Sequence, residues 1–284
     1  MSFSHILLLL FLMLIWGFNF VVIKVGVDGM QPIFFSFVRF FLASIPAIFF
    51  VKRPRVPWKV LIRYGLVMFA AQYALLFLGM YAGITAGLAS LILQVQIFFT
   101  ALLGILFFHE KPHSWQIIGA LVAFSGIALI VFNLDESTTL PAFFLVVAAA
   151  ATWSTGNLIS KKIGAVNMLG LVVWGSLIAW PPLLLLSLGM EGIPQFDYSW
   201  SAISSALYIA YFSTLLGFGI WSWFLHHYPL STVAPFTLLA PVIAMGSSAL
   251  VLGEPLQSWK IIAACLIITG LLINLFGSRF FRGC

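Results

Sequence analysis

Long apolar segments, each about as long as a membrane-spanning helix, follow one another along almost the whole chain. Periodicity alone does not separate a buried soluble helix from a membrane helix, but the length of these segments and their lack of charge do. Prolines, glycines and short polar stretches separate them. The predicted spans are residues 5–24, 32–51, 60–82, 86–107, 115–133, 140–160, 167–188, 200–222, 230–252 and 259–277. We therefore expect an all-α polytopic membrane protein with ten transmembrane helices.

One of these segments occurs twice. Residues 110–132 read EKPHSWQIIGALVAFSGIALIVF, and residues 254–276 read EPLQSWKIIAACLIITGLLINLF. Shifted by 144 positions, the two copies share a Glu, a Ser-Trp pair and a glycine in the middle of the helix. Chance rarely matches such distinctive residues in order, so we interpret the pattern as an internal repeat. We place the first half at residues 1–137 and the second half at residues 138–284.

The two halves are predicted to cross the membrane in opposite directions. Glu110 follows the fourth span and Glu254 follows the ninth, so five spans, an odd number, separate the two copies. A weaker sequence match occurs near the start of each half, where Trp16 corresponds to Trp153 at an offset of 137. Inverted repeats are common in secondary transporters, which bind substrate near the middle of the membrane between the halves. We therefore expect two inverted five-helix repeats around a central cavity.

Composition supports the membrane assignment, and the basic residues predict an orientation. The chain is 63% hydrophobic and 7% charged, against about 25% charged in soluble domains. With the N-terminus in the cytoplasm, ten basic residues fall on the cytoplasmic side: Lys52, Arg53, Arg55, Lys59, Arg63, Lys111, Lys161, Lys162, Arg279 and Arg282. Only Lys24 and Lys260 fall outside, so the positive-inside rule predicts that both termini are cytoplasmic. Because the basic residues are dispersed among span ends, we expect no nucleic-acid partner.

The sequence offers no catalytic or metal-binding constellation. No cluster of His, Asp and Glu falls within the spans, and neither the serine-hydrolase elbow motif nor the paired-histidine zinc motif occurs. The phosphate-binding loop of ATP-driven pumps is missing as well. A channel would be expected to use rings of charge from an oligomer, whereas this chain duplicates itself internally. We therefore expect no enzyme, no cofactor and no metal, and a chain compatible with a monomer.

Several stretches resemble a known transporter family. They are WGFNFVVIKVG at 16–26, VRFFLASIPAIFFVKRPRVP at 38–57, GLASLILQVQIFFTALLG at 87–104 and the two Glu-led segments. These stretches are similar to the EamA family of the drug/metabolite transporter superfamily. The resemblance implies export of small metabolites, such as amino acids and derivatives like O-acetylserine and cysteine, across the bacterial inner membrane by alternating access. A lipid flippase, or a carrier of a nucleotide-linked compound, vitamin or drug, remains the alternative.

Polar and indole side chains within the spans are the candidates for the substrate site, because a polar group is costly in the bilayer unless it faces protein or water. The predicted set is Trp16, Asn19, Gln72, Tyr73, Gln94, Gln96, Trp153, Asn157 and Tyr211. Amides can donate to a carboxylate and accept from an ammonium, and indole faces attract cations. The set therefore predicts a small zwitterionic, amino-acid-like substrate.

Some of these residues have a competing structural interpretation. Gln94 and Gln96 are two positions apart and cannot share a helical face, so we expect one to line the cavity. Gln96 is favoured because Thr100 follows one turn later on its face. Any single amide could instead be a hydrogen bond between helices. Arg39, which has apolar neighbours, could pair with a substrate carboxylate, but we favour snorkelling to the outer interface or binding to backbone carbonyls as the simpler interpretation.

Candidate gating residues lie near span nine and at the repeat junctions. Pro235 and Pro241 bracket the middle of span nine, where each removes a backbone hydrogen bond and permits a bend. This predicts either a gate or an ordinary helix kink. For Glu110 and Glu254, at span ends, we expect ion pairing at the repeat hinge. Because no Asp or Glu lies deep in any span, facilitated efflux or exchange fits better than proton antiport.

Overall fold

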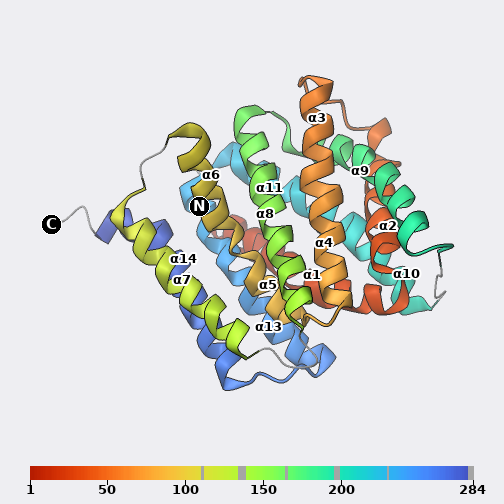
Figure 1. Cartoon of the computed structure of the whole chain (residues 1–284). Coiled ribbons are helices and arrows are strands. Elements are labelled where there is room, and N and C mark those ends of the chain that lie inside the picture. Colours follow the sequence, from red (N-terminus) through yellow and green to blue (C-terminus); the bar gives the residue numbers. More distant parts are fainter. Residues whose placement is uncertain (110–111, 134–138, 164–165, 195–198, 229, 281–284) are drawn as a thin grey trace.

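The computed structural model describes residues 1–109, 112–133, 139–163, 166–194, 199–228 and 230–280. Within these residues the chain is built from helices joined by short connections (Figure 1). In the part of the chain that the structure describes, ten helical segments are long and apolar enough to cross a membrane. The ten predicted spans are therefore confirmed, with boundaries that move by several residues. We number them span one to span ten.

Five spans are single helices: α1 (Phe3–Gly29), α7 (Ser114–Phe132), α8 (Leu140–Ile163), α9 (Met168–Met190) and α14 (Ser258–Phe280). Span two is α2 (Pro32–Ser44) with a 3-10 turn (Ala47–Phe49), and span four is α5 (Ala86–Leu93) with α6 (Gln96–Phe108). Span three is α3 (Trp58–Tyr64), a π-helical segment (Gly65–Ala71) and α4 (Gln72–Tyr81). Span eight is α10 (Trp200–Leu207), a π-helical segment (Tyr208–Leu216) and α11 (Gly217–His227). Span nine is α12 (Leu230–Val233), a 3-10 segment (Ala234–Leu238) and α13 (Leu239–Leu252).

The distortions of the helices recur at the 144-residue offset of the repeat. The π-helical segment Gly65–Ala71 corresponds to 209–215, which lies inside the π-helical segment of span eight. Span four is interrupted at residues 94–95, which correspond to 238–239, where the 3-10 segment of span nine passes into α13. Broken helices and π-helical bulges often border functional sites in membrane proteins. The two halves thus share one pattern of local backbone irregularity.

The helices α6 and α13 also end in the same way. His109 follows α6 with φ 54°, and Gly253 follows α13 with φ 67°. Both residues are in the left-handed conformation that commonly terminates a helix, and they are 144 positions apart. Glycine adopts this conformation without strain, and histidine is among the few other residues enriched there.

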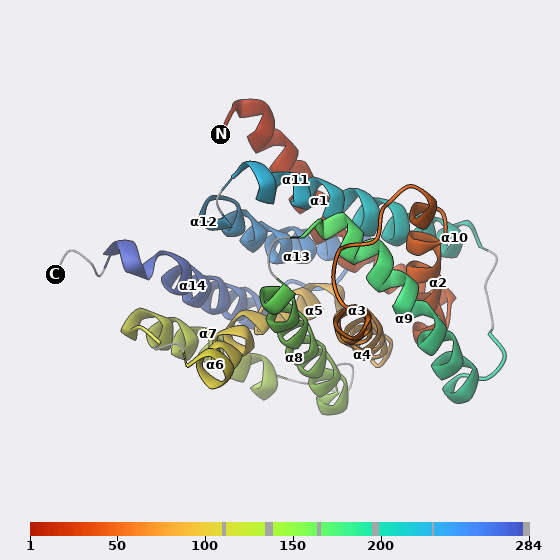
Figure 2. The same cartoon turned by 90° about the horizontal axis from the view of Figure 1, so that it is seen from above.

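The helices α7 and α14, the two copies of the repeated segment, lie side by side in both views (Figures 1 and 2). A Cβ atom built on Gly119 would lie 2.6 Å from the carbonyl oxygen of Gly270, and one on Gly126 would lie 2.9 Å from that of Ala263. Rising residue numbers on α7 therefore meet falling numbers on α14, so the two helices run antiparallel. In the repeat, Gly119 corresponds to Ala263 and Gly126 corresponds to Gly270, so the two contacts are equivalent. This geometry is what the predicted inversion requires of these two helices.

Two carboxylates bind helix N-termini of the other half of the chain. Glu191, which follows α9, accepts hydrogen bonds from the amides of Ile33 (2.8 Å) and Phe34 (3.0 Å) at the start of α2. Glu254, which follows α13, accepts from the amides of Ala86 (2.8 Å) and Gly87 (3.3 Å) at the start of α5.

These carboxylates satisfy donors that a helix N-terminus leaves free, and they complement the helix dipole. The observed contacts of Glu254 therefore differ from the ion pair that we expected, because amides of a helix N-terminus take the place of a cationic side chain. The other predicted hinge residue, Glu110, lies outside the described residues.

Candidate functional site

Three apolar clusters form the packed interior, and some predicted site residues lie where the clusters meet. Tyr73 and Trp153 pack against both the cluster that contains Phe77 and the cluster that contains Phe69. Trp16 packs against the third cluster, which surrounds Phe224. Aromatic side chains from spans three and six therefore lie at the boundary between two of these clusters.

The clearest polar contact between predicted site residues joins the two halves. The Nδ2 atom of Asn157, on α8, donates to Oε1 of Gln96, the first residue of α6, at 2.9 Å, and lies 3.4 Å from Oγ1 of Thr100. The Ser154 hydroxyl, one turn before Asn157, donates to the backbone carbonyl of Gln96 at 2.8 Å. Span four breaks just before Gln96, so its side chain and backbone both contact span six.

Both amides of this pair keep hydrogen-bonding capacity. Gln96 and Asn157 are half-buried, and Gln96 Nε2 and Asn157 Oδ1 make no hydrogen bond with the described residues. One donor and one acceptor group thus remain available beside each other. The structure brings Gln96 and Asn157 together, as a site would require, through a contact that equally serves as an interhelical hydrogen bond.

Trp16 and Asn19 lie one turn apart on α1 but differ in their surroundings. The indole Nε1 of Trp16 donates to the Ser213 carbonyl at 3.2 Å, in the π-helical segment of span eight, and its ring packs against Phe218 and Trp221. Asn19 is 7% exposed, and its Oδ1 atom has no hydrogen-bond partner among the described residues. A buried acceptor without a partner costs about 1–3 kcal/mol, so Asn19 is poised to accept a hydrogen bond.

Gln72 and Tyr73 directly follow the π-helical segment of span three. Gln72 is 1% exposed, and its Oε1 atom also has no partner among the described residues. The Tyr73 hydroxyl lies 3.4 Å from Nη2 of Arg39. Tyr73 therefore sits next to a cation that we did not include in the site.

Arg39 does not snorkel, and this corrects our expectation. Its side chain is 1% exposed, with Nε donating to Oγ1 of Thr214 at 3.1 Å and the guanidinium carbon 4.1 Å from the centre of the Tyr73 ring. The physical reason is that α2 packs against α9, α4 and the π-helical segment of span eight, so the side chain points into protein. A hydroxyl and an aromatic face bind the guanidinium in place of the interface or backbone carbonyls.

The remaining predicted residues make no polar contact with one another in the described part of the chain. Gln94 is half-buried in the turn that breaks span four, and Tyr211 is half-buried in the π-helical segment of span eight. Pro235 lies in the first turn of the 3-10 segment of span nine, and Pro241 is buried in α13. Among the described residues, no group of His, Cys, Asp and Glu is arranged to hold a metal ion.

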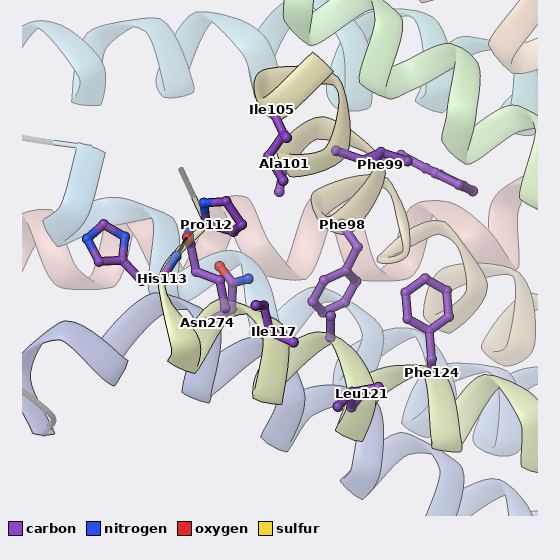
Figure 3. A pocket seen from close by; sticks show the side chains of 13 residues that line it. Phe98, Phe99, Ala101, Ile105, Pro112, His113, Ile117, Leu121, Phe124 and Asn274 are labelled. Carbon is purple, nitrogen blue, oxygen red and sulfur yellow. Dashed lines mark hydrogen bonds between the residues drawn. The ribbon is translucent and has the colours of Figure 1, made fainter. Parts of the chain in front are cut away.

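Two cavities open elsewhere in the structure. A groove of about 740 Å³ lies between α6 and α7 (Figure 3). Its lining is mainly apolar: Phe98, Phe99, Ala101, Leu102, Ile105, Pro112, His113, Gln116, Ile117, Ala120, Leu121, Phe124 and Asn274. A cavity of about 520 Å³ is lined by Val166, Asn167, Leu169, Gly219, Ser222, Trp223 and His226. None of these residues belongs to the predicted set, so the central cavity stays a prediction.

Comparisons with known proteins agree on one transporter family. A family model described as the EamA-like transporter family matches residues 3–132 and again residues 140–276. The chain is 42% identical over 283 residues to proteins named "Probable amino-acid metabolite efflux pump" from Escherichia coli and Salmonella typhimurium, covering 96% of this chain and 95% of each relative. It is 26% identical to a "Probable terminal-alkyne amino-acid exporter" from Streptantibioticus cattleyicolor, covering 91% of this chain and 89% of the relative.

A solved crystal structure resembles this chain with a TM-score of 0.68. The match covers 99% of this chain and 100% of the other, at 15% sequence identity. At this identity the likeness shows a shared fold and nothing about substrate.

Proposed function

The chain belongs to the EamA-like transporter family, and from this premise we propose that it exports amino acids or their derivatives by alternating access. Family membership and the ten apolar helices make it a multi-pass membrane transporter of small metabolites and not an enzyme. We propose O-acetylserine and cysteine as examples of its substrates, and a bacterial inner membrane as its location. The names of the relatives at 42% identity support the amino-acid class.

The observation that carries the proposal is the contact between Gln96 and Asn157. It joins the first half of the chain to the second, where span four is broken. If the halves separate there, the two amides can exchange their mutual hydrogen bond for bonds to polar groups of an amino-acid substrate. Such an exchange has a net free energy of about 0.5–1.5 kcal/mol per hydrogen bond. Weak, uncharged contacts of this kind suit a carrier that must also release its substrate.

We propose that residues 1–137 and 138–284 are the two inverted repeats that rock against each other. The antiparallel packing of α7 and α14 supports the inversion, and so do the matching distortions of the two halves. Glu254 and Glu110 would act at the ends of the moving helices, and Pro235 and Pro241 would allow span nine to bend. Both termini would face the cytoplasm.

The experiment that tests the substrate class compares growth media. Cells that overproduce the protein should release more of one or more amino-acid derivatives than cells with an empty vector, as measured by mass spectrometry. The rise should disappear in a Gln96→Ala, Asn157→Ala double variant present in the membrane at the same level. A medium enriched only in compounds without an amino-acid moiety would contradict the proposed substrate class.

The groove between α6 and α7 favours one other function. Its phenyl and aliphatic lining could hold an acyl chain, with His113, Gln116 and Asn274 near a polar headgroup. A lipid flippase is therefore the second candidate. Measuring lipid transbilayer movement and amino-acid flux in the same vesicles separates the two functions.

A further inference from the structure

We infer that Arg39 binds the carboxylate of the transported substrate. The inference rests on the proposed export of amino acids and deepens it, because it names the group that recognises the acid. Neither the family model nor the names of the relatives assigns a role to this residue.

The Arg39 guanidinium lacks a negative partner among the described residues. The chain has seven Asp and Glu residues, all of them in connections or near span ends. Of those that the structure describes, Asp28 pairs with Lys24 at 2.8 Å, while Glu191 and Glu254 bind backbone amides. A charged side chain held in the membrane interior is costly and is by default a functional residue. A carboxylate ligand would supply the missing charge.

The neighbours of Arg39 orient the guanidinium and leave part of it free. Thr214 Oγ1 accepts from Nε at 3.1 Å and donates to the Ile209 carbonyl at 2.7 Å, so the hydroxyl is fixed on both sides. The Tyr73 ring covers the guanidinium at 4.1 Å. Nη1 is buried and has no partner among the described residues. A guanidinium held in this way offers N–H groups in its plane, the geometry that binds a carboxylate through two parallel hydrogen bonds.

The position of Arg39 also suits recognition of a ligand with a single carboxylate. Its contacts come from both halves of the chain, with Tyr73 on span three and Thr214 on span eight. Arg39 is also linked to the amide pair. Tyr73, which contacts Arg39, packs against the same two apolar clusters as Trp153, and Ser154, the residue after Trp153, donates to the Gln96 carbonyl. The repeat partner of span two, Met168–Met190, contains no Lys or Arg. Spans two and seven thus supply one cation between them for the acid, while amides and indoles remain for the ammonium.

A purely structural role for Arg39 makes a different prediction. If the residue only tied α2 to spans three and eight, its replacement would lower stability and affect all ligands equally. If it binds the acid, its replacement removes the preference for ligands that carry a carboxylate. The test therefore measures discrimination between matched ligands and uses stability only as a control.

The experiment measures ligand binding by the purified full-length protein in detergent, by calorimetry or thermal stabilisation. The probes are L-cysteine against cysteamine, which lacks only the carboxylate, and propionate against propionamide. Arg39→Gln should weaken binding of L-cysteine and propionate about 10- to 100-fold and leave cysteamine and propionamide unchanged. Arg39→Lys should keep part of the preference for the acids. Lys59→Gln, which removes an exposed cation, should bind as the wild type does.

The possible outcomes separate this inference from the proposed function. Wild-type preference for propionate over propionamide without binding of L-cysteine would contradict the amino-acid class and leave the carboxylate subsite standing. Wild-type indifference to the carboxylate in both pairs would overturn the inference. So would full discrimination by Arg39→Gln, and, if that variant does not fold, discrimination by Arg39→Lys that equals the wild type.

Discussion

At the scale of single residues, the interior keeps several polar atoms without partners. Asn19 Oδ1, Gln72 Oε1 and Arg39 Nη1 are buried and unpaired among the described residues. Each such atom costs folding free energy, whereas replacing it by an apolar group would remove the cost. Unpaired acceptors and donors on three neighbouring spans are consistent with groups that a substrate satisfies.

Alanine substitution tests the amides. Asn19→Ala and Gln96→Ala should each lower efflux of cysteine or O-acetylserine about two- to twelvefold at sub-saturating substrate, because each removes one hydrogen bond worth about 0.5–1.5 kcal/mol. The measurement is the initial rate of export at equal abundance in the membrane. Phe144→Leu, at an exposed position of α8, should export as the wild type does. Normal export by both alanine variants would identify the amides as structural contacts.

Some of the candidate site residues could be predicted from the sequence. Asn19, Gln72 and Tyr73 were predicted as candidates because few polar residues occur in the spans, and their role in a site stays a prediction. The burial of Arg39 was missed, since its neighbours Phe37, Val38, Phe40 and Phe41 are apolar and give no indication of which side faces protein. Its partner Thr214 lies 175 positions away, on a π-helical segment that residue spacing does not reveal. No Asp or Glu lies deep in any span to pair with Arg39, and this absence could have indicated that Arg39 is a candidate site residue.

At the scale of helices, close packing and helix breaks explain much of the architecture. Length and low charge predicted the ten spans, and the repeated segment predicted that α7 and α14 are equivalent helices of the two halves, but not that they pack together. The helix ends bound by Glu191 and Glu254 could not be predicted, because each contact joins residues more than 150 positions apart. The groove between α6 and α7 could not be predicted either, because the sequence does not distinguish an apolar residue that faces lipid from one that lines a groove.

A matched pair of glycine substitutions tests the packing of α7 on α14. Gly119→Ala would place its Cβ atom 2.6 Å from the Gly270 carbonyl oxygen, so the helices must separate. Overpacking of this kind costs about 1–3 kcal/mol. Gly246→Ala in α13 meets no atom within 4 Å and should be neutral or slightly stabilising. Thermal unfolding in detergent measures both, and equal stability of the two variants would contradict the close approach of these helices.

At the scale of the whole molecule, two copies of one five-helix unit account for the chain. The family model matches each copy separately, and the sequence repeat pointed to the same division. In the proposed arrangement, inversion of the second copy would gather basic residues on one side of the membrane, as the positive-inside rule expects. The proposed alternating access would follow from movement between two similar bodies.

The orientation has its own test. A reporter that is active only in the periplasm, fused after Cys284, should be inactive because the C-terminus is expected in the cytoplasm. The same reporter inserted after Gly192, in the connection between spans seven and eight, should be active. The opposite result, with both fusions detected in the membrane, would reverse the proposed topology.

A flux assay shows whether the protein carries amino-acid metabolites across the membrane. Purified protein is reconstituted in vesicles that contain unlabelled L-cysteine and a fluorescent lipid. Entry of external labelled L-cysteine and transbilayer movement of the lipid are then recorded together. We expect exchange of cysteine that falls in the Gln96→Ala variant, with lipid movement no faster than in protein-free vesicles. Lipid movement above that background without cysteine exchange would contradict this expectation and favour a flippase.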